Sequence, residues 1–264
     1  MISIASRVER IGDVERLVVA RAVAGRALYW TSAYLVDGAL IDSCHRHARA
    51  EVLRWLDGRA PEVALATHHH EDHAGNFAAL ACDVIAPRGD VARLASGERV
   101  PLYRAITWGH REPARARGGD DARAGASRFR AVATPGHTPD HVAWFDPDRG
   151  HAYVGDAVLG KRKMLMREED VWGVVRSLEA LRALDPDAIL PAHGPVIDRP
   201  RATLEGHLAH FDRLARECRR LADRGLGIAR IRARVLGPEG GLAWFSGGEI
   251  SKTNLVRGLL TPRT

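Results

Sequence analysis

Four short apolar stretches of this sequence each end at residues that commonly bind metals, and this recurrence constrains the fold more than any other feature. The stretches are Val63–Ala66, Arg130–Ala133, Ala152–Val154 and Ile189–Leu190. The residues that follow them are His68 in THHHEDHAG, His137 in TPGH, Asp156 after glycine, and His193 in PAH. Strand ends on one edge of a layered α/β fold converge, and function resides on such loops. The sequence therefore predicts one common site.

The loop of residues 67–75 is the richest of these four segments. Four histidines and two carboxylates lie within six of its residues, in a chain with 13 histidines. Neutral imidazole and carboxylate are ligands for Zn, Fe or Mn. A purification tag would lie at a terminus and would lack the interleaved acids. In an extended loop, His68 and His70 point the same way, and Asp72 and His73 can then face a neighbouring ion.

The remaining pattern predicts short strands alternating with helices. Asp37-Gly38 separates two apolar runs, which indicates a hairpin. Further strands are expected at 83–86, 129–132 and 142–145, and helices at 46–56 and 171–184, with another opening at Gly75-Asn76-Phe77. Residues 96–127, rich in Arg, Gly and Asp, are predicted to form a long irregular surface excursion. Beyond Pro200 the chain is predicted to be helical.

Composition excludes several classes of protein. The 264 residues suit one large domain, alone or with a small appendage, and the 45% hydrophobic content is enough for a sizeable core. No stretch has the apolar length of a membrane span. Because the N-terminus is charged from Arg7 onward, it lacks the apolar core of a signal peptide, and we expect a cytoplasmic protein. Cys44, Cys82 and Cys218 are scattered and odd in number, which favours reduced thiols.

The net charge of +6 and the pI of 9.7 raise the question of nucleic-acid binding. The chain has only three lysines, Lys161, Lys163 and Lys252, and its many arginines are spread widely without interleaved aromatic residues. This distribution indicates an arginine-rich composition of the whole chain rather than a basic surface stripe that would bind nucleic acid. We expect no nucleic-acid partner and no membrane association, and a small-molecule substrate instead.

Taken together, HxHxDH at residues 68–73, TPGHT at 134–138, GD at 155–156 and AHG at 192–194 resemble the metallo-β-lactamase superfamily. The resemblance covers residues ~10 to 200. It implies an α/β fold of the αβ/βα type, a four-layer sandwich of two sheets with helices outside, followed by a small helical appendage. We therefore expect a catalytic domain at 1–198 and a helical region at 199–264. Cys44 stands where the family commonly has Gly, a departure that concerns packing more than chemistry.

Carried onto this chain, the resemblance implies two metal positions. The first is held by His68, His70 and His137. The second is held by Asp72, His73 and His193, and Asp156 bridges both. The implied cofactors are two divalent ions, Zn before Fe or Mn, sharing a hydroxide that acts as the nucleophile. Asp72 is also the candidate to relay a proton to the leaving group.

The other histidines have simpler interpretations. His110, His151, His207 and His210 are expected to be surface or hydrogen-bonded structural residues. His69 and Glu71 alternate with the ligand positions and are expected to point away from the metals. His141 follows His137 closely. It has two open interpretations, support of a metal ligand or contact with the substrate.

The reaction implied is hydrolysis of an ester or thioester, of the glyoxalase II type. Asp156 argues against secreted β-lactamases, His70 against diiron flavoproteins, and Leu159 against lactonases, which have Tyr at that position. A lactonase or phosphodiesterase of the same fold remains an alternative. Lys161 and Lys163 are either a solvated loop or a contact for an anionic substrate group. The C-terminal segment FSGGEISKTNLVRGLL resembles a helix that covers the site in some relatives.

Two other classes remain open. A persulfide dioxygenase-like oxygenase would bind one iron through His68, His137 and Asp156. A binding or regulatory protein with a relic site would lose some of its ligands, whereas all seven positions are intact here.

Overall fold

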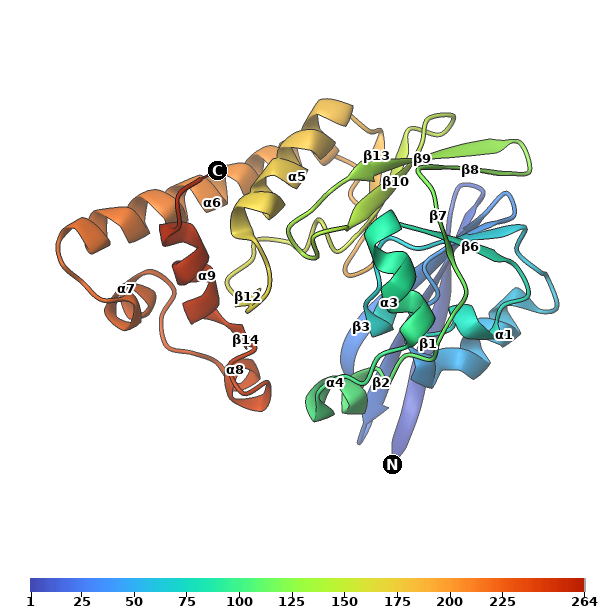
Figure 1. Ribbon diagram of the computed structural model, residues 1–264, viewed down its shortest axis with the longest axis horizontal. Helices are drawn as coiled ribbons and strands as arrows, with labels where there is room; N and C mark the ends of the chain where they lie inside the picture. The colour runs from blue at the N-terminus through green and yellow to red at the C-terminus, as the bar shows by residue number, and fades with distance from the viewer. Residues whose placement is uncertain (264) are drawn as a thin grey trace. The chain divides into compact units, whose positions relative to one another are not determined.

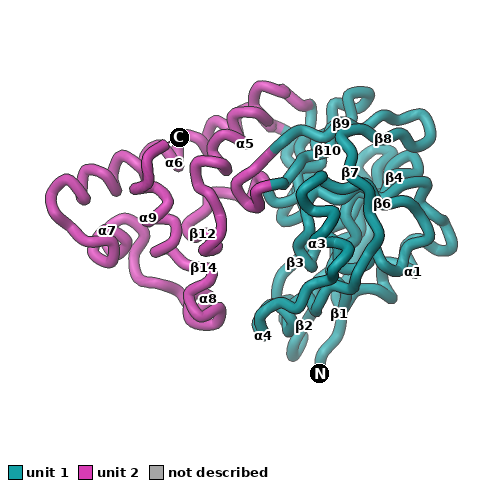
Figure 2. The backbone as a smooth tube through the Cα atoms, in the orientation of Figure 1, with its two compact units in different colours: residues 1–133, 140–156, 187–198 teal, residues 134–139, 157–186, 199–264 magenta. Residues whose placement is uncertain are grey.

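The computed structural model describes residues 1–263, so only Thr264 of the predicted helical region lies outside the described residues. The chain divides into two compact units (Figure 2). Unit 1 comprises residues 1–133, 140–156 and 187–198, and unit 2 comprises residues 134–139, 157–186 and 199–264. The chain thus passes between units at the predicted boundary after residue 198 and at four earlier points. The division into domains 1–198 and 199–264 stays a prediction.

Unit 1 contains two β-sheets (Figure 1). The strands of the first sheet, in spatial order, are β1 (Ile2–Ile11), β2 (Val14–Val23), β3 (Arg26–Val36), β4 (Ala39–Ile41), β5 (Val63–Leu65), β6 (Asp83–Ala86) and β7 (Arg117–Gly118). Strands β1 to β4 pair antiparallel, and β4 to β7 pair parallel. The second sheet has the order β13 (Ala188–Pro191), β11 (His151–Gly155), β10 (Val142–Asp146), β9 (Ser127–Ala133) and β8 (Asp121–Ala124).

The central strands of the first sheet contribute to a different apolar core on each face, because successive side chains of a strand point to opposite faces. In β5, Val63 and Leu65 join the core shared with the second sheet, whereas Ala64 joins the core on the other face. The shared core also contains Phe129, Trp144, Tyr153 and Leu190. The other core includes residues of α1 (Arg49–Leu56), η2 (Phe77–Ala79) and α3 (Val91–Ser96). Burial on both faces explains why the parallel strands are short, uninterrupted apolar runs.

Most predicted elements of unit 1 are confirmed. The hairpin of β3 and β4 turns at Asp37 and Gly38, whose φ angles of 50° and 85° match the turn that such a dipeptide favours. The predicted helix at 46–56 is a 3₁₀ turn, η1 (Arg46–Ala48), that continues into α1. The helix expected from residue 75 is only η2. The side-chain amide of Asn76 donates to the carbonyls of Ser43 and His45 and fixes the chain before it.

The prediction of an irregular surface excursion at 96–127 is wrong. The segment contains α4 (Leu102–Thr107), β7 and β8, and it follows η3 (Arg88–Asp90) and α3. Arg104 and Arg111 are buried there. Arg104 pairs with a carboxylate, and Arg111 donates to the Leu94 and Arg93 carbonyls. Arginine composition suggested solvent exposure, but paired or hydrogen-bonded guanidinium groups are compatible with burial.

Unit 2 is largely helical. Its elements are β12 (Leu165–Met166), α5 (Val171–Leu184), α6 (Pro200–Asp223), α7 (Ile228–Val235), α8 (Gly241–Phe245), β14 (Ile250–Ser251) and α9 (Lys252–Leu260). Helix α5 has the predicted bounds, and the side chain of Asp170 caps its first turn by accepting from Trp172 N. Helices α5, α6 and α9 bury Leu178, Phe211 and Leu255.

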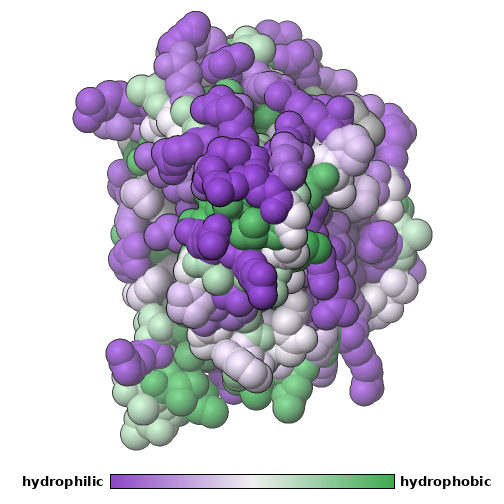
Figure 3. Space-filling view, turned by 90° about the vertical axis from the view of Figure 1, so that its left-hand side faces the viewer, coloured by the Kyte–Doolittle hydropathy of each residue, from purple (hydrophilic) through white to green (hydrophobic). Residues whose placement is uncertain are grey.

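The surface of unit 2 carries both polar and apolar side chains. Hydrophilic side chains cover most of the face shown in Figure 3, with hydrophobic ones between them. The exposed large apolar residues of unit 2 include Leu242, Trp244 and Phe245 of α8. In the part of the chain that the structure describes, no helix has both the length and the apolar character needed to cross a bilayer.

Candidate metal centre

The histidine loop begins where β5 ends and is buried throughout. His68 and His70 lie in the non-helical segment after β5, and Asp72 and His73 lie in α2 (Glu71–Ala74), a single helical turn. The rings of His68 and His70 have centroids 4.6 Å apart, and those of His68 and His73 are 4.1 Å apart. Burial of so many ionisable side chains requires compensating partners or a metal ion.

Two further strands of unit 1 bring acidic and imidazole groups to this loop. Asp156 follows β11, and His193 follows β13. The ligand atoms of Asp72, His73 and His193 all lie within 4.8 Å of one another, and so do those of His68, His73 and Asp156. The structure therefore brings these five predicted positions together, although their role as ligands stays a prediction.

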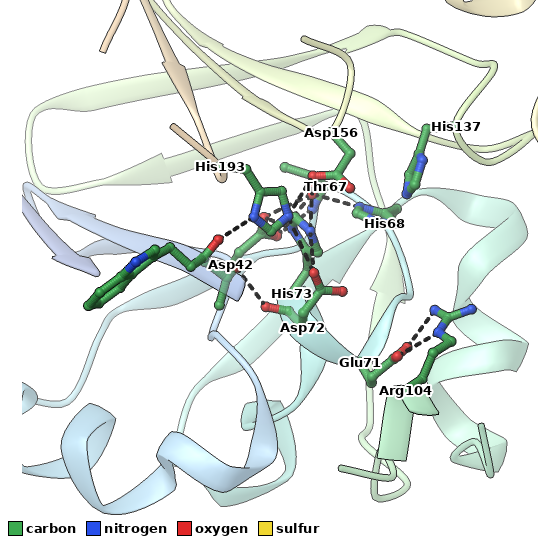
Figure 4. Close-up of polar contacts among 12 residues, drawn as sticks. Asp42, Thr67, His68, Glu71, Asp72, His73, Arg104, His137, Asp156 and His193 are labelled. Carbon is green, nitrogen blue, oxygen red and sulfur yellow. Dashed lines mark hydrogen bonds and ion pairs between the residues drawn. The ribbon is translucent and has the colours of Figure 1, made fainter. Parts of the chain in front are cut away.

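The histidine nitrogens of this cluster face carboxylate oxygens (Figure 4). The Nε2 atom of His73 lies 3.2 Å from Asp156 Oδ1 and 3.7 Å from Asp72 Oδ2. The Nε2 atom of His193 lies 3.1 Å from Asp156 Oδ1 and 3.3 Å from Asp72 Oδ2. Two carboxylates thus converge on the same two ring nitrogens.

The opposite edges of both rings are already engaged. His73 Nδ1 lies 2.7 Å from Asp42 Oδ2, and His193 Nδ1 lies 2.5 Å from the Trp30 carbonyl oxygen. Because these oxygens only accept, each Nδ1–H donates, and in a neutral ring Nε2 then carries a lone pair. Lone pairs of nitrogen and oxygen would face one another at the centre of the cluster. A cation relieves this repulsion, so the donor set fits a divalent metal ion of the kind that imidazole and carboxylate bind.

The electrostatics of the cluster agree with this fit. Burial lowers the pKa of His73, but the Asp156, Asp72 and Asp42 carboxylates outweigh it and raise that pKa well above its usual value. For His193, burial also lowers the pKa, and Asp156 again contributes to raising it well above normal. Burial raises the pKa of Asp72, whereas His73 and His193 bring it below normal. Positive charge is therefore favoured here, and a proton and a metal compete for the same nitrogens.

His137 belongs to unit 2 and has its own support there. Its Nδ1 lies 2.7 Å from Glu169 Oε1, and Glu169 also pairs with Arg162 and accepts from Met166 N. Burial would raise the pKa of Glu169, but Arg162 and His137 outweigh it and lower that pKa to about 2. The carboxylate is thus ionised and orients the ring, as is common for metal-binding histidines. Metal ligation by His137 stays a prediction.

The two residues expected to point away from the metals have other partners. His69 Nδ1 lies 2.8 Å from Asp90 Oδ1, and both oxygens of Glu71 accept from Arg104. His141 Nε2 accepts from Asp156 N, which favours support of the cluster for this residue. His210 Nε2 donates to the Arg162 carbonyl, a hydrogen-bonded structural role as predicted.

Asp42 and Glu169 are supporting residues that the sequence interpretation did not identify. Asp42 directly follows β4, and this position after a buried strand was an available signal. Glu169 lies just before α5 beside two other acids, and nothing in the sequence relates it to His137.

Asp42→Asn is expected to weaken metal binding about 10- to 100-fold, the usual effect of losing a partner of a metal-binding histidine. Asp42 Oδ1 accepts from Thr67 N, and Oδ2 accepts from His73 and the Thr67 hydroxyl. An asparagine side chain accepts hydrogen bonds only at its oxygen, so it can replace only one of the two accepting oxygens of Asp42. The dissociation constant is measured by competition with a chromophoric chelator. The matched control is Asp90→Asn, which alters the partner of His69; equal affinity in the two variants would contradict the role of Asp42.

Comparisons with known proteins agree with the architecture and the motifs. The sequence profile of the metallo-beta-lactamase superfamily matches residues 31–193, more than half of the chain. A Beta-lactamase-like protein 2 homolog from Caenorhabditis elegans is 27% identical over 160 residues, 59% of this chain and 50% of that protein. A hydroxyacylglutathione hydrolase from Cereibacter sphaeroides is 32% identical over 144 residues, 53% of this chain and 51% of that protein.

The chain spans about half the length of these curated relatives. Among solved structures, a beta-lactamase domain protein from Burkholderia ambifaria superimposes with a TM-score of 0.66 at 20% identity, covering 98% of this chain and 85% of that one. This likeness confirms the predicted fold class. By its sequence profile and its fold, the chain belongs to the metallo-β-lactamase superfamily.

Proposed function

We propose that the protein is a metal-dependent hydrolase that binds two divalent ions, Zn before Fe or Mn, and cleaves a small ester or thioester. One observation carries the proposal: the Nδ1 atoms of His73 and His193 are both engaged, and their Nε2 atoms face the carboxylates of Asp72 and Asp156. The similarity to hydroxyacylglutathione hydrolases supports the substrate class.

In this proposal the seven predicted residues hold the ions. His68, His70 and His137 hold the first, Asp72, His73 and His193 hold the second, and Asp156 serves both. When bound, the ions would polarise the substrate carbonyl and lower the pKa of a coordinated water towards neutrality. The protein orients its ligands through Asp42, Glu169 and the Trp30 carbonyl. In this proposal Asp72, whose Oδ2 lies 3.3 Å from His193 Nε2, also passes a proton to the leaving group.

A substrate panel with metal analysis tests this function. Protein purified without added metal should contain two Zn, Fe or Mn ions per chain. It should hydrolyse activated thioesters or esters faster than lactones, phosphodiesters or β-lactams, as the similarity to hydroxyacylglutathione hydrolases indicates. One iron per chain with oxygen consumption on a persulfide would replace this proposal by the oxygenase. No metal and no turnover would favour a relic site.

A further inference from the structure

The loop that carries four of the proposed ligands has little support of its own. Helix α2 comprises only four residues, and its N-cap residue, His70, makes no side-chain capping bond. Backbone hydrogen bonds of this turn run from His73 N and Ala74 N to the His70 carbonyl. A single helical turn is marginal in isolation, because its first hydrogen bonds fix many dihedral angles for little gain. Contacts from outside the turn must therefore set the direction of Asp72 and His73.

Thr31 and Ser43 donate to the Asp72 and His73 carbonyls, and a contact to a side chain of the turn, on the side away from the proposed metals, comes from Arg104. Its Nε and one terminal nitrogen each donate to a different oxygen of Glu71, both at 2.7 Å. The Glu71 side chain is 0% exposed and that of Arg104 is 6% exposed. Figure 4 shows Glu71 directed towards Arg104, away from the cluster formed by Asp72, His73 and His193. A bidentate pair fixes orientation as well as distance, which a single hydrogen bond does not.

The other end of this contact is itself anchored. Arg104 lies in α4, where His47 Nε2 lies 3.0 Å from the Ala105 carbonyl oxygen and Arg21 donates to the Ile106 carbonyl. Arg21 belongs to β2 and His47 to η1, so α4 is fixed to the first sheet and to the start of the α1 helix. The guanidinium group therefore holds α2 against a fixed support.

We propose that Arg104 is a positioning residue that orients the metal-binding turn through Glu71. The inference rests on the proposed function, since it assigns a role in binding the proposed ions. Glu71 follows His70 and precedes Asp72, so a side chain fixed at both carboxylate oxygens restrains the backbone between ligands. Buried ion pairs are weak evidence for a gain in stability, and fixing one geometry is the better-attested use.

The test separates positioning from stability. Arg104→Met leaves the Glu71 charge buried without its partner, and both the unfolding temperature of the metal-free protein and the metal affinity should fall. The double variant Glu71→Met/Arg104→Met removes the unpaired charge and should recover the unfolding temperature. Its metal affinity should remain about 10- to 100-fold weaker than that of the parent. Recovery of both quantities would show that the pair is only structural and would overturn the proposal.

A second pair of variants decides the matter if the double variant does not regain stability. Arg104→Lys keeps the charge and loses the bidentate fork. Arg111→Lys is the matched control, because Arg111 is buried and donates to Arg93 and Leu94 carbonyls. Metal affinity, measured by chelator competition, should fall in Arg104→Lys only; equal affinities would overturn the proposal. If the parent protein binds no metal, the proposed function fails instead.

Discussion

Asp156→Ala is expected to lower turnover by more than about 100-fold and to reduce the bound metal per chain. Even residues that only support ligands affect metal affinity or activity by 10- to 100-fold, and a carboxylate shared by two ions should matter more. Asp156 Oδ1 lies 3.2 Å from His73 Nε2 and 3.1 Å from His193 Nε2, so its loss removes the anion common to both rings. Metal content by elemental analysis and kcat on the best thioester measure the effect.

The control for this variant is His207→Ala. His207 is buried in α6, and its pKa is lowered by burial and by Lys161, His210 and Arg162, so it is a neutral core histidine. Its replacement should leave metal content unchanged while costing some stability. If both variants lost metal to the same extent, the separation of Asp156 from ordinary buried residues would be wrong.

The elements that carry the candidate residues could be predicted because their signals are local. Strands β5, β11 and β13 contain short apolar runs that end at glycine, proline or polar residues, and these strands and β9 each precede a candidate residue as expected. Helix α5 begins after a capping Asp and ends before Pro186, which explains why its bounds were predicted correctly. The convergence of the loops followed from the α/β pattern, and the structure places those of unit 1 together.

The parts that were not predicted depend on partners distant in sequence. Asp42 and His73 are 31 residues apart, and Glu71 and Arg104 are 33 residues apart. Nothing in the local sequence distinguishes Arg104 from the exposed arginines around it, so the sequence predicts a surface location for the segment 96–127. Strands β1 and β2 were not predicted either. In β1 the apolar residues Ile2, Ile4 and Val8 stand at alternate positions, as is typical of a strand.

Supporting residues such as Asp42 and Arg104 have a common physical logic. A cluster of buried imidazoles and carboxylates is unfavourable unless the geometry is fixed and a cation is bound. The fold fixes the geometry from outside: Asp42 and the Trp30 carbonyl hold His73 and His193, and Arg104 holds Glu71. The metal is then expected to contribute to stability as well as to chemistry, and this can be measured directly.

Removal of divalent ions with a chelator is expected to abolish hydrolysis, and added divalent metal should restore it. Removal of the ions should also lower the unfolding temperature of the protein. A ligand that binds only the native state stabilises it by about 4 kcal/mol when its free concentration is 1,000 times Kd. At roughly 2–4 °C per kcal/mol for a chain of this size, the shift is on the order of 10 °C. Thermal unfolding with and without metal measures it.

The control for the chelator experiment is His73→Ala. This variant removes the imidazole that faces both Asp72 and Asp156, so the second ion loses a ligand and the unfolding temperature should respond less to metal than that of the parent. Metal bound elsewhere on the surface would shift the parent and the variant equally, which would contradict the assignment of the stabilising ions to this cluster. An unshifted parent that keeps its activity in chelator would go further, because the reaction would then need a nucleophile that the proposed site does not contain. A full response of the parent together with a smaller response of His73→Ala is therefore the result that ties stability, metal and turnover to one set of residues.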